Sequence, residues 1–140
     1  MPIEADLIMA QSAQETEVGV SALGIAWQVR PPNPIPWALV AVLRASRDLV
    51  GTEHQAMIKL EREDGQPMAE GLGDLMTLEF NLTPDGLTDR GFTSPIVESY
   101  GFNLLPIPLE PATEYRFRLW VDGETRDHWV ANFRTTPAQG

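Results

Sequence analysis

The chain is most constrained between Glu114 and Thr135, where apolar and polar side chains alternate. The apolar residues take the odd positions on both sides of an Asp-Gly pair: Tyr115, Phe117, Leu119 and Val121 before it, and Trp129, Ala131 and Phe133 after it. A period of two is typical of strands with one buried face. Asp122-Gly123 favours a tight turn because glycine accepts a positive φ. The stretch therefore predicts a β-hairpin.

The parity of the apolar residues also predicts the register of this hairpin. A two-residue loop would pair odd with even positions and set Phe117 opposite His128. An odd-length loop pairs odd with odd, so that the two apolar faces coincide. Burying each aromatic side chain is worth roughly 1.5–3 kcal/mol, and a slip by one residue would turn all of them outward. We therefore expect a three-residue loop with Gly123 in the left-handed region.

Apolar alternation and turn signals predict further short strands along the chain. Twelve prolines and eleven glycines, spread rather than clustered, divide it into short elements, as all-β domains require. Beside the hairpin we expect strands at 5–11, 18–30, 37–46, 54–63, 75–82 and 96–109. We also expect a polar loop at 12–17, a bulge or bend near Gly24 and a mobile loop at 87–95. These seven to nine strands favour an all-β fold, a two-sheet antiparallel β-sandwich of immunoglobulin-like or Greek-key type, formed by residues 1–140 as one domain.

Two neighbouring segments leave alternatives open. Residues 30–37 contain four prolines, which lack a backbone donor and so exclude a central strand. The segment is either a stiff crossover between strands, which we favour, or a docking element that places Trp37 at the rim of a binding site. Residues 37–43 are apolar on both parities, as in a strand covered on both faces or one whose outer side meets a partner. A helix is a further alternative there.

The approach to the hairpin carries a second signal. Its pattern is Leu109-x-Pro111-x-Thr113-x-Tyr115. It resembles the tyrosine corner of immunoglobulin-like and fibronectin type III-like domains, in which the tyrosine hydroxyl bonds to upstream backbone. The resemblance implies a β-sandwich and covers this hairpin alone.

A broader resemblance is distributed over most of the chain. It is carried by Ala5-Asp6, the Gly-Val-x-x-Leu-Gly-x-x-Trp segment at 19–27, the proline-led strand at 36–43, Glu63-Asp64-Gly65, and the Tyr-x-Phe-x-Leu-x-Val-Asp-Gly segment that ends at Gly123. Together these segments are similar to an uncharacterised bacterial family of small β-sandwich proteins. The family has no assigned activity, so the resemblance implies a fold and no catalytic residue.

Charge and composition limit the partners that we expect. The net charge is −10, from 20 acidic and 10 basic residues, and such a field repels nucleic acid and anionic membrane surfaces. The chain has no cysteine, which excludes disulfides and thiolate chemistry. No apolar run is long enough to cross a bilayer, and residues 1–4 lack the basic start of a secretory signal. We expect a cytoplasmic protein, with a virion as an alternative location.

Candidate catalytic or metal-binding residues are few. His54 and His128 lie in different expected strands without metal-ligand spacing, and we expect both at the surface. The acidic groups Glu61/Glu63/Asp64 and Asp85/Asp89 could supply oxygens to calcium, but they lack the spacing of a calcium loop. No phosphate-binding, dinucleotide-binding or nucleophile-elbow motif is present. We therefore predict no enzyme, no cofactor and no metal site.

One surface remains as a candidate for association. Trp120 has outward parity and shares it with Arg116 and Arg118, and tryptophan and arginine are enriched where proteins bind one another. Alternatively, a loop of the same domain covers Trp120. We predict a non-catalytic β-sandwich that associates with itself or within a larger assembly, phage-related or secretion-related. The alternatives are a ligand-binding or carbohydrate-binding module that stacks its ligand on Trp37 or Trp120, and, more remotely, a hydrolase.

Overall fold

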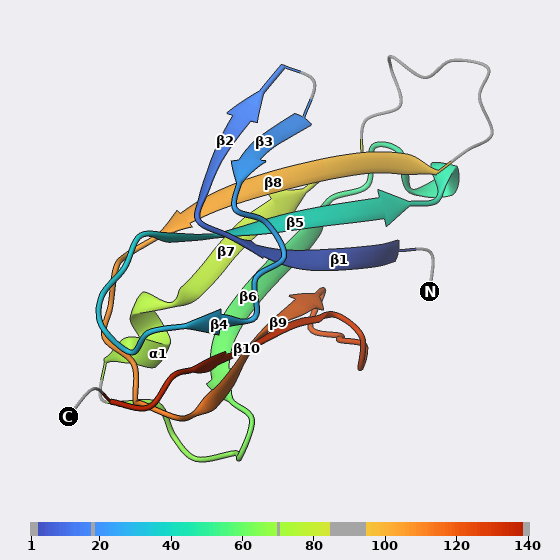
Figure 1. Cartoon of the computed structure of the whole chain (residues 1–140). Helices are drawn as coiled ribbons and strands as arrows, with labels where there is room; N and C mark the ends of the chain where they lie inside the picture. The colour runs from blue at the N-terminus through green and yellow to red at the C-terminus, as the bar shows by residue number, and fades with distance from the viewer. Residues whose placement is uncertain (1–2, 18, 70, 85–94, 139–140) are drawn as a thin grey trace.

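The computed structural model describes residues 3–17, 19–69, 71–84 and 95–138 and shows an almost entirely β fold (Figure 1). Among these residues there are ten strands, and the helical segments are one turn of 3-10 helix (47–49) and one short α-helix. The elements are β1 (Ile3–Ala10), β2 (Ser12–Thr16), β3 (Gly19–Leu23), β4 (Val29–Arg30), β5 (Trp37–Ala45), β6 (His54–Arg62), α1 (Leu72–Leu75), β7 (Thr77–Leu82), β8 (Ile96–Leu104), β9 (Glu114–Val121) and β10 (Val130–Thr135).

Two sheets form the sandwich. The smaller has the strand order β1-β5-β8, and the larger has the order β4-β10-β9-β6-β7. All neighbours are antiparallel except β4 and β10, which pair in parallel through two residues each. The predicted all-β sandwich is confirmed. Its ten strands exceed the expected seven to nine because β4 is a separate short strand and because β2 and β3 form a third, two-stranded sheet.

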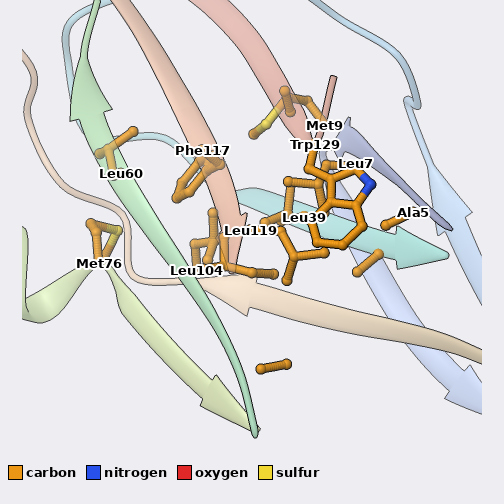
Figure 2. Packing of buried hydrophobic residues seen from close by; sticks show 14 of the residues in the cluster. Ala5, Leu7, Met9, Leu39, Leu60, Met76, Leu104, Phe117, Leu119 and Trp129 are labelled. Atoms are coloured by element: carbon orange, nitrogen blue, oxygen red, sulfur yellow. The ribbon is translucent and has the colours of Figure 1, made fainter. Parts of the chain in front are cut away.

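The core fills the space between the two main sheets. Four large rings lie at its centre, since Trp37, Tyr115, Phe117 and Phe133 are each at most 3% exposed and their ring centroids lie 5.6–6.1 Å from one another in four pairs. Trp129 is fully buried, and Figure 2 shows it among aliphatic side chains of the smaller sheet. Apolar burial of this kind is the main favourable term in folding.

The C-terminal hairpin has the predicted register but not the predicted loop. Tyr115 faces Phe133 and Phe117 faces Ala131, so odd positions pair with odd positions. The turn itself has only two residues, Asp122 and Gly123, with φ values of 51° and 79°, as a type I′ turn requires. Val121 therefore pairs with the even-numbered Glu124, and residues 125–129 leave the strand pairing before β10 resumes it with odd positions opposite odd positions. The expectation of a three-residue loop was therefore wrong, because the chain corrects its parity after the turn.

Residues 12–17 do not form the expected loop. Residues 12–16 are β2, which pairs with β3 in a hairpin that stands over the outer face of the smaller sheet (Figure 1). Ala13 of this hairpin packs with Ala10 and with Ala38 and Val40 of β5 in a second buried cluster. The apolar outer face of β5 is thus covered by the protein's own chain, and the helix alternative for 37–46 is excluded.

Close contacts fix the hairpin to β8. A Cβ atom added to Gly101 would lie 3.0 Å from the Cβ of Ala13 and 3.2 Å from Val20 Cγ1. The side-chain amide of Asn103 accepts a hydrogen bond from Ala13 N–H at 3.0 Å and donates one to Ala13 C=O at 2.8 Å. The amide therefore satisfies both backbone hydrogen-bonding groups of Ala13, as the backbone of a neighbouring strand would.

Residues 31–36 form the predicted crossover, which leads from β4 in the larger sheet to β5 in the smaller one. The segment after β8 holds it in place. Leu109 N–H donates to Pro32 C=O at 2.9 Å, and Trp37 Nε1 donates to Leu105 C=O at 2.7 Å. The bend expected near Gly24 is present, with φ values of 61° at Gly24 and 63° at Ala26.

The tyrosine corner is also present, because Glu110 N–H donates a hydrogen bond of 3.0 Å to the Tyr115 hydroxyl. Strands β6 and β7 agree with the expected strands at 54–63 and 75–82, and β8 ends before the prolines at 106 and 108. The loop predicted over 87–95 falls outside the described residues except for Pro95.

Candidate functional site

The predicted association surface lies on the outer face of the larger sheet. Trp120, Arg116 and Arg118 project from this face of β9 and are half-buried. Glu61 of β6 accepts hydrogen bonds from Arg116 Nε at 2.5 Å and from Arg118 Nε at 3.1 Å, and Arg118 Nη1 donates to Arg126 C=O at 3.2 Å. The sequence therefore grouped the three residues correctly. Both guanidinium groups are engaged within the protein itself.

Trp37 does not belong to any surface. It is 1% exposed and packs against Phe117 and Phe133, with ring centroids 5.6 and 5.7 Å away. The expectation that Trp37 forms the rim of a binding site was wrong, because the crossover turns this side chain inward between the sheets. Trp37 therefore cannot serve as a stacking platform for a carbohydrate.

His54 lies in a hydrogen-bonded chain that the sequence did not predict. Its Nδ1 is 2.6 Å from Asp122 Oδ2, and its Nε2 is 2.7 Å from Thr52 Oγ1. The hydrogen bond with His54 and a second one from Gln55 N–H hold the pKa of Asp122 below its usual value. The order threonine–histidine–aspartate is that of a hydrolase triad.

The polar groups around this chain are engaged in contacts within the protein. The Thr52 hydroxyl has a single proton and two neighbours that can accept it, Leu49 C=O at 2.6 Å and His54 Nε2 at 2.7 Å. The N–H groups of Gly51 and Thr52 donate to Pro84 C=O and Leu49 C=O, so neither is free to stabilise an oxyanion. The contacts instead tie the loop before β6 to the turn after β9.

The remaining predicted polar residues lie apart. His128 Nε2 pairs with Glu4 Oε2 at 2.9 Å on the surface, away from the His54 chain. Asp64 accepts hydrogen bonds from Arg62 and from Gln66 N–H, and Asp85 and Asp89 lie outside the described residues. No cluster of three or more His, Asp or Glu side chains suited to a metal occurs in the part of the chain that the structure describes.

The most distinctive surface feature is an apolar patch at the connection between β3 and β4. Three large apolar side chains are exposed within seven residues: Leu23 is 69% exposed, Ile25 60% and Val29 46%. We call these three residues the apolar patch. After the bend at Gly24, Ala26 N–H donates to Met9 C=O of β1 at 2.7 Å, and Trp27 packs edge-on against Phe133 at 5.6 Å. The sequence signalled the bend but not the exposed patch.

A pocket of about 610 Å³ opens beside the apolar patch. Its lining is mostly apolar and consists of Gln11, Gly24, Ile25, Trp27, Val29, Arg30, Pro31, Ile35 and Pro36. Two segments that the sequence analysis treated separately, the bend at 24–27 and the proline crossover, thus form the walls of a single pocket. A concave, apolar site with few polar groups is typical of ligand and peptide pockets.

Arg30 is the charged side chain of this lining, and it is 2% exposed. Its Nε donates to Pro31 C=O at 2.9 Å, and its Nη2 donates to Asn33 C=O at 2.6 Å and to Ile107 C=O at 3.0 Å. The guanidinium carbon lies 4.5 Å from the centre of the Trp37 ring, within cation–π range. Burial lowers the pKa of Arg30 to about 10. Nη1 is buried and has no hydrogen-bond partner among the described residues.

A second, more polar hollow of about 740 Å³ lies at the same end of the larger sheet and shares Val29 with the pocket. Its charged side chains include Arg62, Asp64 and Arg134. Arg62 and Asp64 are paired at 2.8 Å, so this hollow offers a solvated ion pair rather than a selective site.

The fold and surface define a β-sandwich with a mostly apolar pocket beside the connection between β3 and β4. No protein-family profile matches the chain, and no characterised protein shows significant sequence similarity to it. The resemblance to a bacterial family of small β-sandwich proteins therefore stays a prediction. In the residues that the structure describes, no helix has the length and apolar character needed to span a membrane.

Proposed function

We propose that this protein is a non-catalytic interaction module that binds a partner protein through the apolar patch and the adjoining pocket. The observation that carries the proposal is a concave site whose lining includes two exposed apolar side chains, Ile25 at 60% and Val29 at 46%, with Leu23, 69% exposed, next in sequence to the lining residue Gly24. Apolar side chains gathered at one place on a monomer mark interaction surfaces, whereas single ones need no explanation.

Charge favours a different protein over a second copy as the partner. Two copies would each bring a net charge of −10, and this repulsion opposes self-association. The apolar outer face of β5, which suggested an oligomer from the sequence, is covered by the β2–β3 hairpin. The role of a subunit in a larger assembly is consistent with both observations.

The alternatives have less support. The two tryptophans considered as stacking platforms for a carbohydrate are poorly placed, since Trp37 is buried and Trp120 is half-buried beside two paired arginines. A hydrolase would need free backbone donors beside its nucleophile, and the N–H groups of Gly51 and Thr52 both donate to carbonyls within the protein.

A peptide selection tests the proposal. A library of displayed random peptides is selected on the wild-type protein, and the enriched peptides are measured on Ile25→Ser and on Val97→Ser. Val97 lies on β8 and is 60% exposed, the same fraction as Ile25, so it is a matched control. We expect the Ile25→Ser variant to bind about tenfold more weakly, the loss that about 1.4 kcal/mol produces, while Val97→Ser binds as the wild type does. Failure to enrich any peptide, or equal binding to both variants, would contradict the proposal.

A further inference from the structure

Arg30 is a buried cation that has no counter-ion in the part of the chain that the structure describes. It is 2% exposed, and none of the ion pairs among the described residues includes it. The chain has 20 acidic residues, so carboxylates are abundant elsewhere. A buried charge is costly unless it is paired and hydrogen-bonded. The buried guanidinium of Arg30 therefore needs compensating contacts.

Its internal contacts explain the position of the guanidinium only in part. Three N–H groups, one on Nε and two on Nη2, donate to the backbone carbonyls of Pro31, Asn33 and Ile107, and the Trp37 ring lies against the guanidinium. These contacts clamp the crossover to the segment after β8 and fix the side chain in one orientation. Nη1 is left with both of its N–H groups unpartnered among the described residues. The hydrogen bonds to the crossover and to Ile107 therefore leave the two N–H donors of Nη1 unused.

The unpartnered Nη1 belongs to a residue that lines a pocket. Among the described residues that line the pocket, Arg30 is the only charged one, and most of the others are apolar. A single positive group in an apolar pocket suits a ligand that has an apolar body and one negative group. Arginine is well suited to the recognition of carboxylates, because its planar donors match their two oxygens.

We infer that the pocket binds an apolar segment of a partner protein that carries a carboxylate, and that this carboxylate pairs with Nη1 of Arg30. The inference rests on the proposed function and adds to it the chemistry of the partner. The apolar side chains of the segment contact the exposed Ile25 and Val29, and the carboxylate reaches the buried guanidinium of Arg30. Because Nη1 is itself covered, the crossover has to shift to admit the carboxylate. Residues 31–36 pair with no strand, so the shift breaks no strand pairing, but it has to disturb the hydrogen bonds that Arg30 and Leu109 donate to carbonyls of this segment.

The test uses two probes that differ only in charge. Acetyl-leucyl-leucine with a free carboxylate and its carboxamide are titrated into the ¹⁵N-labelled wild-type protein, and the Arg30 Nε–H and Trp27 indole N–H resonances are followed. We expect both resonances to shift, and the acid to bind at least about tenfold more tightly than the amide. The comparison needs no variant, so it holds even if Arg30 is essential for folding.

Two variants extend the comparison. In Arg30→Gln we expect the acid and the amide to bind equally, whereas in Arg134→Gln, which changes an exposed arginine outside the pocket, the preference for the acid should persist. Equal binding of the two probes to the wild type would overturn the inference and would leave Arg30 as a clamp of the crossover. Absence of binding up to about 10 mM would also overturn it. The proposed function is judged separately by the peptide selection, so the two can fail independently.

Discussion

The Tyr115 hydroxyl accepts the backbone N–H of Glu110 at 3.0 Å, while its ring stacks on Phe133 at 5.6 Å. One side chain thus joins the segment that enters β9 to the aromatic core. We predict that Tyr115→Phe lowers the free energy of unfolding by about 1–3 kcal/mol, because it leaves the Glu110 N–H without its partner in a partly buried place. Urea denaturation measures this loss as a lower midpoint at an unchanged m value. A midpoint equal to that of the wild type would show that water replaces the hydroxyl.

Gly101 is predicted to be necessary for docking of the β2–β3 hairpin. In Gly101→Ala the new Cβ would approach Ala13 Cβ to 3.0 Å, so the hairpin must move away, at a cost of about 1–3 kcal/mol. Hydrogen exchange should then accelerate at β2 and β3 more than at β6 and β9. Gly73→Ala is the control, because nothing lies within 4 Å of the added Cβ there. Equal effects of the two substitutions would contradict the prediction.

The Asp122–His54 contact predicts a pH dependence of stability. The folded-state pKa of Asp122 is below its usual value, so the contact stabilises the protein above the unfolded pKa of about 3.9. This stabilisation is lost as the pH falls through the lower folded value. The side chain of Asp122 is 52% exposed, so we expect only about 0.2–1 kcal/mol, as for other exposed pairs.

Asp122→Asn is the variant that isolates this effect, because Asn-Gly also favours a type I′ turn. Near neutral pH the wild type should be the more stable protein in urea denaturation, and the difference should shrink as the pH falls below about 4. A difference that is independent of pH would mean that the carboxylate charge does not matter.

The oligomeric state gives a further prediction. We expect sedimentation velocity at tens of micromolar and physiological salt to show a monomer, since the outer face of β5 is covered and the net charge is −10. Should a dimer appear and be lost in Ile25→Ser but not in Val97→Ser, the partner of the apolar patch would be a second copy of the chain. A dimer that persists in both variants would place self-association elsewhere, with the Trp120 face of β9 as the first candidate.

The sequence predicted those parts of the fold that depend on local periodicity. The odd parity of Tyr115, Phe117 and Phe133 predicted the register, because an even pairing would have exposed the rings. The β2–β3 hairpin escaped prediction because its first strand buries a single apolar residue, Ala13. Its sequence is therefore as polar as that of a loop.

The candidate site was predictable only in part. The bend at Gly24 and the proline crossover were expected, but nothing in either pattern indicates that together they line one pocket. Arg30 gave no signal, because its acceptors are backbone carbonyls, one of them 77 positions away. The contact between His54 and Asp122 depends likewise on the pairing of β6 with β9, which brings together residues 68 positions apart.

The hairpin that stands over β5 has a consequence for solubility. Without it, Ala38 and Val40 would present a flat strip of small apolar side chains on an open sheet, the kind of surface on which chains aggregate. Residues 12–23 therefore act as a built-in shield, and a truncated or permuted form that lacks them would be expected to precipitate rather than to remain in solution.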